Sequence, residues 1–422
     1  MIGTALLGLA LARAAAAQAP VAGDSPVLEQ VTFDEAVSRA TSHNPSVGEA
    51  AQAILRAEAL LSEARSVFLP LAYGNAGTAV LDAARGFGGN IVQPRTQTAF
   101  SATAAYPVLA ASRWAAKNQA ADRVETARVA ARETRLQVAV SAAQAYLAVV
   151  AAERQLEIVV RNRDTAKALE DFARTRLEAG QGSRLNHVRS LQLLGSAEGL
   201  VELAALLVRR AQEALGVAVF APGPLGAKGE PTLPPAIVPA DDSWLGRRPD
   251  VQLFTSELAG AERVASDAWK NWLPNVTASF TPRYVTPAGL FEPSKSWRAF
   301  FSLEVPIFDG TLRPRKRAFE ADREAARLRL DARENEARSE VRFAQEAVRR
   351  TERIVTAVGQ AAESAREALR ITEIAYRAGA TTNIEVVQAQ QAARNAEIEA
   401  AVAEDRLRQA RLDLLVALGQ FP

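Results

Sequence analysis

Apolar residues recur at alternating steps of four and three along two long stretches of the chain. In the first stretch they occupy Leu136, Val140, Ala143, Leu147 and Val150. This spacing places the side chains on one stripe of a helix and is typical of a coiled-coil seam. The same rhythm recurs at Ile354, Val358, Ala361, Ala365, Ala368, Thr372 and Ala375, and again at Leu407, Ala410, Leu414 and Ala417.

The pattern predicts two very long helices, over about 112–178 and about 313–378. At 1.5 Å per residue each would extend for roughly 100 Å. Both are densely charged outside the seam, so we expect them to stand in water. Gly180 and Gly379 follow directly and are predicted to let the chain reverse, because glycine adopts the left-handed conformation that ends many helices.

Four other stretches are nearly free of charge and rich in Thr, Ala, Val and aromatic residues. They cover about 71–81, 96–106, 276–286 and 297–308. Ten or eleven residues is the length that a tilted strand needs to cross a bilayer. Their alternation of apolar and polar residues is only fair, so soluble hairpins stay an alternative. The glycine-containing connection 82–95 is expected to be a loop.

The spacing of prolines and glycines repeats along the chain. Pro107 precedes Gly180 by 73 residues, and Pro306 precedes Gly379 by the same interval. A repeated interval of this size is the signature of two structural units in one chain. Each unit is predicted to contain a short helix, a strand pair, a very long helix, a turn and a further helix.

These patterns divide the chain into four parts. Residues 1–19 are predicted to be a secretory signal peptide, with an apolar core and an Ala-x-Ala cleavage site. The first structural repeat is expected over 20–218 and the second over 248–422. The Pro- and Gly-rich stretch 219–247 is predicted to link them. No later stretch approaches 18 uninterrupted apolar residues, so no membrane-spanning helix is expected.

Composition argues against chemistry carried by this chain. It has no Cys and only two His, His43 and His187, which fall in different predicted elements. We therefore expect no catalytic residues, no metal site and no cofactor, and the chain is predicted not to be an enzyme. Basic residues are interleaved with acidic ones, and the net charge is only +2, so no nucleic-acid partner is expected.

Four membrane-length strands cannot close a barrel, and an open strand edge is not tolerated in lipid. The strands of one chain must then join those of other copies, and three copies would supply twelve strands. The fold class predicted is mainly α with membrane β-strands. It is an internally duplicated protomer whose homotrimer forms a 12-stranded β-barrel continuous with a long periplasmic α-helical barrel.

The doubled motifs resemble those of the TolC family of outer-membrane efflux and secretion channels, over about 32–419. The motifs are Asn44-Pro45 and Arg248-Pro249, Phe68-Leu69-Pro70 and Trp272-Leu273-Pro274, Pro107-Val108-Leu109 and Pro306-Ile307-Phe308, and the two turns Leu177-Glu178-Ala179-Gly180 and Tyr376-Arg377-Ala378-Gly379. The resemblance implies an outer-membrane location in a Gram-negative-type cell. It also implies extension into the periplasm and docking to a periplasmic adaptor protein and an inner-membrane pump, with the RND type first among the candidates.

The resemblance also implies a gate at the periplasmic end. Carried over by position, Tyr376 and Asn186 fall where a polar contact restrains the inner helix pair. Glu385 and Gln388 fall where acidic side chains narrow the pore entrance, although Gln388 and Asn186 replace acids there. Ordinary packing of Tyr376 and simple solvation of Glu385 stay as alternatives. Gly180 and Gly379 are the predicted adaptor-facing helical turns.

The function predicted from these features is that of a passive trans-periplasmic duct in a tripartite efflux system. Its cargo would be small molecules, either drugs or metal ions, and its other contact would be outer-membrane lipid. One alternative is a duct for type I protein secretion. Another is a structural coiled-coil protein of the envelope with no channel, and a third is the periplasmic adaptor itself, which the doubled strand pairs disfavour.

Overall fold

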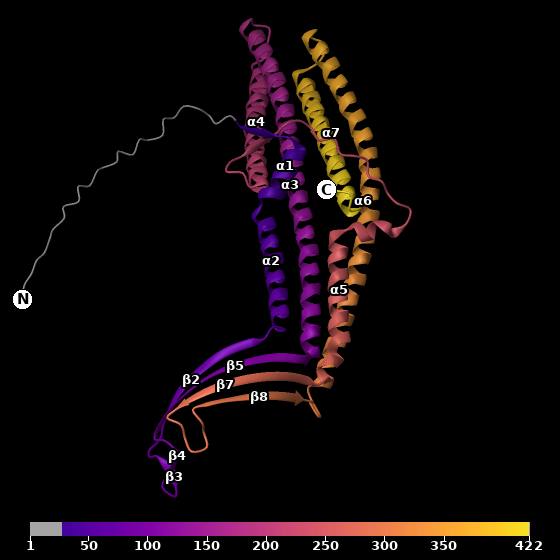
Figure 1. Cartoon of the computed structure of the whole chain (residues 1–422). Helices are drawn as coiled ribbons and strands as arrows, with labels where there is room; N and C mark the ends of the chain where they lie inside the picture. Colours follow the sequence, from indigo (N-terminus) through magenta and orange to yellow (C-terminus); the bar gives the residue numbers. More distant parts are fainter. Residues whose placement is uncertain (1–27, 422) are drawn as a thin grey trace, which may run out of the picture.

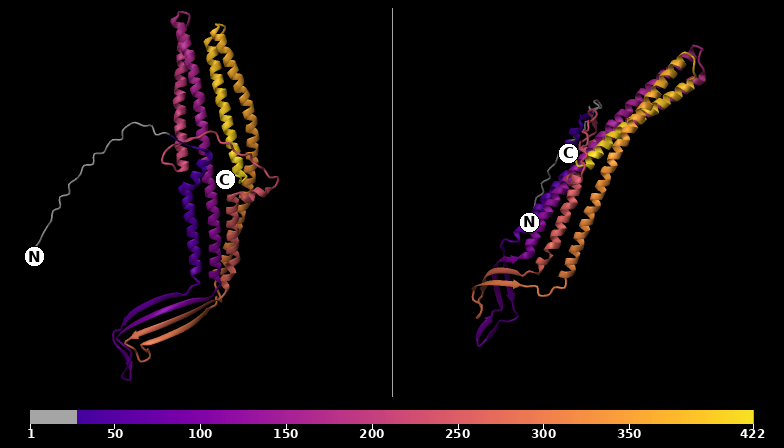
Figure 2. Two further views of the ribbon diagram at one scale, coloured as in Figure 1. Left: turned by 45° about the horizontal axis from the view of Figure 1, so that its top comes forward. Right: turned by 90° about the vertical axis from the view of Figure 1, so that its right-hand side faces the viewer.

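The computed structural model describes residues 28–421, so the predicted signal peptide over 1–19 lies outside the described residues. Long paired helices stand on a curved sheet, with the helical turns at one end of the molecule and the sheet at the other (Figure 1). Both views in Figure 2 show the same narrow, extended body. In chain order the elements are β1 (Glu29–Val31), α1 (Phe33–His43), α2 (Pro45–Ser66), β2 (Leu71–Val80), β3 (Arg85–Phe87), β4 (Asn90–Gln93), β5 (Thr96–Ala110), α3 (Ala111–Glu178), α4 (Arg184–Val219), β6 (Leu225–Ala227), η1 (Asp242–Arg247), α5 (Pro249–Asp267), η2 (Ala268–Trp272), β7 (Asn275–Thr286), β8 (Lys295–Glu304), α6 (Leu312–Arg377) and α7 (Asn383–Ala417).

The two halves present their elements in the same order: a helix, two strands, a very long helix and a shorter one. The helices predicted over 112–178 and 313–378 correspond to α3 and α6, each within one residue at both ends. The shorter helices α2 and α4 pack along α3, α7 packs mainly along α6, and α5 lies against both long helices. The origin of this order in a duplication stays a prediction.

Local sequence signals set the helix boundaries. The Thr32 hydroxyl accepts a hydrogen bond from the Glu35 backbone N–H and caps α1. Asn44 caps α2 in the same way, and Pro45 occupies the first helical position, where its missing N–H has no cost. At the far turns, Gly180 and Gly379 have φ values of +73° and +78°. A side chain would strain this left-handed backbone, which explains why glycine ends both long helices.

The predicted seam of α3 is a true packing surface. Leu136, Val140, Ala143 and Leu147 join one apolar cluster with Leu412 and Leu415 of α7 and with Phe421. The seam predicted near the end of α7 is likewise buried at Ala410, Leu414 and Ala417. In α6 the seam is only half covered within one chain, since Ile354 is 47% exposed and Ala361 and Ala368 are also exposed.

The expectation that no helix is apolar enough to span a membrane needs correction. By length and composition alone, α3 and α4 each contain an 18-residue window that is hydrophobic enough to cross a membrane. Counting only uninterrupted apolar runs missed these windows, because isolated polar residues such as Ser141 and Gln144 of α3 and Glu198 of α4 interrupt them. The two helices pack along each other instead.

Three strand assignments also differ from expectation. The strand predicted over 96–106 continues to Ala110 through an irregularity after Pro107. The strand predicted over 297–308 ends at Glu304, because Pro306 has no N–H to donate to a ladder. The connection 82–95 contains the small hairpin β3–β4 and is not a plain loop; Gly88 and Gly89 form its turn with positive φ.

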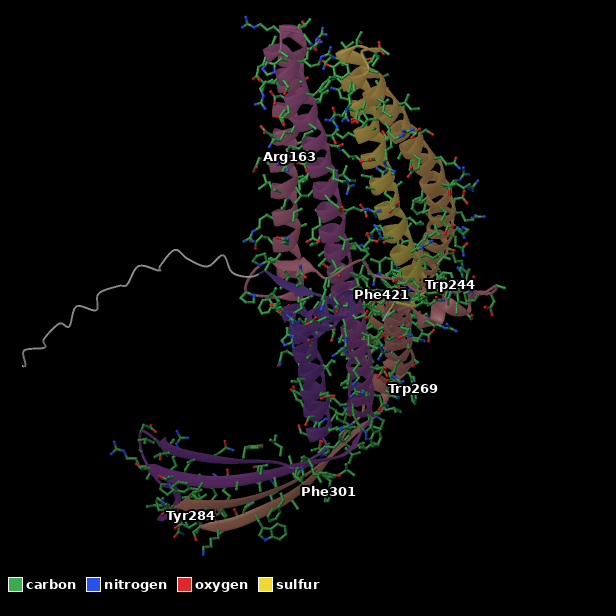
Figure 3. The ribbon with its side chains drawn as sticks, turned by 90° about the horizontal axis from the view of Figure 1, so that it is seen from above. Arg163, Trp244, Trp269, Tyr284, Phe301 and Phe421 are labelled. Atoms are coloured by element: carbon green, nitrogen blue, oxygen red, sulfur yellow. The ribbon has the colours of Figure 1, made fainter. Side chains whose placement is uncertain are left out.

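The predicted linker over 219–247 is part of the fold. Its strand β6 pairs in parallel with β1 near the start of the chain. Trp244 and Leu245 of η1 are buried in a cluster with residues of α6 and α7. Figure 3 labels Trp244 and Phe421 at this middle level of the molecule. The linker therefore joins the two halves through packed contacts.

A buried charge cluster fixes the start of α5 against α6 and α7. Arg248, only 6% exposed, donates to both carboxylate oxygens of Asp250 (3.1 and 2.7 Å) and to Glu340 Oε2 (2.7 Å). It also donates to the carbonyl oxygen of Ala417 at the end of α7 (3.0 Å). Arg333 of α6 bonds to Asp250 from the other side (Nε to Oδ2, 2.8 Å). One side chain thus holds three helices together.

The same cluster predicts acid sensitivity. Burial by itself raises the pKa of Asp250, but hydrogen bonds and charge from Arg248 and Arg333 outweigh it and lower the pKa from 3.8 to about 2. Because the folded pKa is depressed, the stabilisation is present above pH 4 and is lost as the pH falls toward 2. Urea unfolding followed between pH 5 and 2 should show this decline. Asp250→Asn should lower stability at pH 5 and flatten the decline, whereas an equal slope in both proteins would contradict the assignment.

Candidate functional site

The four long strands form one antiparallel sheet in the order β2-β5-β7-β8. Since side chains alternate between the faces of a sheet, the register assigns each residue to one side. Across the central strands, Phe280 lies opposite Ala104 of β5 and Ala299 of β8. These residues belong to a face whose only charged residue within the sheet is Lys295, at the start of β8. Its members are Ala72, Gly74, Ala76, Thr78 and Val80; Thr98, Phe100, Ala102, Ala104 and Tyr106; Val276, Ala278, Phe280, Pro282 and Tyr284; and Trp297, Ala299, Phe301 and Leu303.

Aromatic side chains stand out on this apolar face. Phe301 is 75% exposed and Trp297 is 70% exposed, and the rings of Phe280 and Trp297 lie 5.9 Å apart. Figure 3 labels Tyr284 and Phe301 along the sheet. An exposed apolar surface of this kind is normally covered by a partner or by lipid. The alternation is clearer than the sequence suggested, because only the register shows which strand positions share a side.

The opposite face of the sheet is polar. Its members are Leu71, Tyr73, Asn75, Gly77 and Ala79; Gln97, Ala99, Ser101, Thr103 and Ala105; Asn275, Thr277, Ser279, Thr281 and Arg283; and Ser296, Arg298, Phe300, Ser302 and Glu304. The hydroxyls of Thr103 and Thr281 hydrogen-bond across two strands (3.1 Å). One apolar face and one polar face are the properties of a barrel wall between lipid and a water-filled lumen.

Both edges of the sheet are open. β2 pairs only with β5, and β8 pairs only with β7, within residues 28–421. Each edge strand is ten residues long, and neither is covered by a helix or a loop strand. A long unpaired edge is a template for another strand. In the sheet of a single chain, β2 and β8 therefore each have one side without a strand partner.

At the opposite end of the molecule, all four long and shorter helices meet in one apolar cluster close to the turns. Tyr376 of α6 and Val386 of α7 are buried in it, 6% and 1% exposed. The phenol ring packs edge-on against Phe172 of α3, with centroids 5.5 Å apart. The other members are Ala166, Leu169, Leu193, Ala197 and Val387. This cluster is what joins the α6–α7 turn region to the α3–α4 pair.

One buried amide crosses between the two helix pairs here. Asn383, 2% exposed, donates to the Ser190 hydroxyl of α4 (3.3 Å), and its Nδ2 lies 3.5 Å from the Tyr376 hydroxyl. Ser190 in turn donates to the carbonyl oxygen of Asn186 (3.0 Å). Sequence reasoning missed both Asn383 and Ser190. Asn383 starts α7 directly after Thr382, and no local signal distinguishes it from an exposed residue at a helix start.

The predicted site residues are placed as follows. Tyr376 and Asn186 line the same cleft of about 450 Å³, but the described hydrogen bond of the Tyr376 hydroxyl is with Asn383 and not with Asn186. Glu385 is exposed in the first turn of α7 and accepts hydrogen bonds from the hydroxyls of Thr381 and Thr382. Gln388 is exposed one turn further along, and Gly180 and Gly379 are exposed at the two turns.

The described residues offer little to a metal ion. Over residues 28–421, no group of three or more His, Asp or Glu side chains could hold one. His187 Nδ1 lies 3.5 Å from the buried Glu170 carboxylate, which is too isolated a pair for a metal centre. The two regions instead provide a sheet with two different faces and an apolar contact between the two helix pairs.

Solved structures of outer-membrane proteins have the same fold as this chain. The structure is similar to the Campylobacter jejuni CmeC outer membrane channel, with a TM-score of 0.79 and 17% identity, covering 92% of this chain and 86% of that one. It is similar to the outer membrane protein VceC of Vibrio cholerae, with a TM-score of 0.79 and 18% identity, covering 92% and 96%. The chain therefore has the fold of outer-membrane channel proteins.

Sequence comparison agrees with this fold. The second half of the chain, residues 242–420, matches the family model described as outer membrane efflux protein, in line with the resemblance of its motifs. Nodulation protein T of Rhizobium leguminosarum bv. viciae is 26% identical over 260 residues, which are 59% of this chain and 54% of that protein. The matched region thus spans about half the length of this curated relative. The matched family model is described as an efflux protein of the outer membrane, and the similar structures are those of outer-membrane proteins.

Proposed function

We propose that this protein is the outer-membrane duct of a tripartite efflux system. It would give small molecules, drugs or metal ions, a passive path across the periplasm and the outer membrane. Its partners would be a periplasmic adaptor protein and an inner-membrane pump, with the RND type first among the candidates. The observation that carries the proposal is the four-stranded sheet, with one apolar face that is uncharged apart from Lys295, one polar face and two open edges.

The open edges support a homotrimer. Lipid offers no hydrogen bonds to an unpaired strand, so β8 of one copy would pair with β2 of the next until the ring closes. Three copies of four strands give a twelve-stranded barrel, wide enough for a lumen. The helices support the same assembly, because α4 exposes Leu203, Leu206 and Val217 to 53%, 64% and 76%. A neighbouring copy would cover these apolar side chains.

The cluster at the helical turns supports a gate. Tyr376, Val386 and Asn383 hold the α6–α7 pair against α3 and α4, so their contacts would keep the periplasmic end narrow at rest. An adaptor that binds near Gly180 and Gly379 could separate the pairs without breaking a long stretch of coiled coil. In this arrangement, the exposed Glu385 of three copies would form a ring of negative charge at the entrance.

Purified protein reconstituted in planar bilayers tests the proposal. Discrete, long-lived channels of uniform conductance are expected. A protein that needs no detergent for extraction and gives no conductance would overturn the duct and favour the structural coiled coil.

Glu385→Gln should weaken the cation preference of these channels. Removing three carboxylates from one ring removes a local negative potential, which we expect to lower the ratio of K⁺ to Cl⁻ permeability about threefold at low salt. The reversal potential in a KCl gradient measures this ratio. Glu178→Gln, an exposed carboxylate beside the other turn, is the matched control and should change the ratio little. Equal effects of the two substitutions would remove Glu385 from the entrance.

A further inference from the structure

A single unpaired cation occupies the polar face of the sheet. Arg298 of β8 lies opposite Thr281 of β7 in the register. The Thr281 hydroxyl bonds to Thr103, so both threonines and Arg298 share the polar face. The Arg298 side chain is exposed, and among the described residues no carboxylate lies within ion-pair distance of it.

The other charged residues on this face, Arg283 and Glu304, are respectively paired and distant from Arg298. Arg283 is paired with Glu292 of the β7–β8 connection (2.7 Å). The second carboxylate oxygen of Glu292 accepts from Gln97 of β5 (3.0 Å), which holds this connection over the polar face. Glu304 is six residues from Arg298 along β8, or about 20 Å at the rise of an antiparallel strand. That distance is about twice the Debye length at 0.1 M salt, so the charge of Glu304 is largely screened from Arg298.

Neighbouring strands supply no counter-charge either. β5 and β2 contain no Asp or Glu. The open edge of β8 is the one that would receive β2 of another copy, whose polar-face residues are Leu71, Tyr73, Asn75, Gly77 and Ala79. Closing the barrel would therefore leave Arg298 unneutralised.

We propose that Arg298 forms a cationic ring in the barrel lumen that binds multivalent anions and selects for anionic groups on the cargo. This inference rests on the proposed function, because it requires that the polar face line a water-filled lumen. Three guanidinium groups, permanently charged, would lie at one level of the lumen and raise the local anion concentration there. The conduit would then carry opposite charge at its two ends, with carboxylates at Glu385 and guanidinium groups at Arg298.

The test is block of single channels by citrate, a trivalent anion, added to the barrel side of a planar bilayer. In the unmodified channel we expect citrate to block from the barrel side more strongly than from the helical side. Arg298→Gln should weaken the barrel-side block on the order of tenfold, as expected when three like charges leave one ring. Arg298→Lys keeps the charge and should retain most of the block.

Lys295→Gln is the matched control. Lys295 lies three residues away on the same strand, but its register partner Tyr284 places it on the opposite face, so its loss should leave the block unchanged. Equal block in the unmodified channel and in Arg298→Gln, or an equal loss in Lys295→Gln, would overturn the inference while leaving the channel intact. An absence of any conductance would instead overturn the proposed function, and this inference with it.

Discussion

Tyr376→Ala is expected to open the periplasmic end of the channel at rest. The tyrosine ring is 6% exposed and packs against Phe172 of α3 and Val386 of α7, so its removal leaves a cavity between the helix pairs. Large-to-small aromatic substitutions cost about 3 to 5 kcal/mol. If about 3 kcal/mol of this cost is lost contact between the α3–α4 and α6–α7 pairs, the state in which the two pairs are separated becomes roughly a hundredfold more populated. Larger single-channel conductance and greater susceptibility of cells to bulky antibiotics should follow.

Tyr376→Phe separates packing from hydrogen bonding at this position. It keeps the ring and removes only a hydroxyl whose described partner, Asn383 Nδ2, is 3.5 Å away. A bond of that length is weak, so we expect less than a tenfold effect on the same measurements. A channel that keeps its resting conductance in Tyr376→Ala, with its helix content unchanged, would show that the cluster does not form the gate.

Arg248→Ala is expected to have the largest effect on stability. The substitution removes hydrogen bonds to Asp250, Glu340 and the Ala417 carbonyl, and it leaves Arg333 as the remaining cation beside the two carboxylates. Breaking a buried ion pair by removing one partner costs about 3 to 5 kcal/mol, and the remaining Asp250–Arg333 pair puts the expectation at the lower end. Urea unfolding at neutral pH, followed by the helical circular-dichroism signal, measures the loss.

Arg350→Ala is the control for this change. Its guanidinium also bonds to a carboxylate, that of Glu346, but the arginine side chain is 67% exposed. An exposed pair of this kind contributes at most about 0.5 kcal/mol. If both substitutions destabilised the protein equally, burial of the Arg248 cluster would not be the cause.

The parts of the fold that were predicted correctly depend on local chemistry. The seam residues Leu136 to Leu147 follow the helix period, and the caps Thr32 and Asn44 act on backbone groups two or three residues away. Gly180 and Gly379 are needed because other residues are strained at positive φ. Errors fell at strand ends such as Glu304, where a ladder stops according to its partners and not only to its own residues.

The candidate site shows the same division at the level of single residues. Tyr376 and Asn186 each flank one of the two helical turns, and both line one cleft, while their role in a gate stays a prediction. The contact between the helix pairs, however, is made by Asn383 and Ser190, which are 193 positions apart in the chain. No local pattern distinguishes a buried Asn at a helix start from an exposed one. Its burial depends on where α4 lies.

The sequence by itself determined the long helices, their turns and the four long strands with few charges, because periodicity, glycine conformation and composition are local properties. The tertiary structure alone decided which strand residues share a face, which arginines are paired and how Arg248 joins α5 to the end of α7. These depend on register and on contacts between distant segments. A one-residue slip in register would move every side chain of a strand to the other face of the sheet. Only the strand pairing in the folded protein therefore defines the polar face and the apolar face.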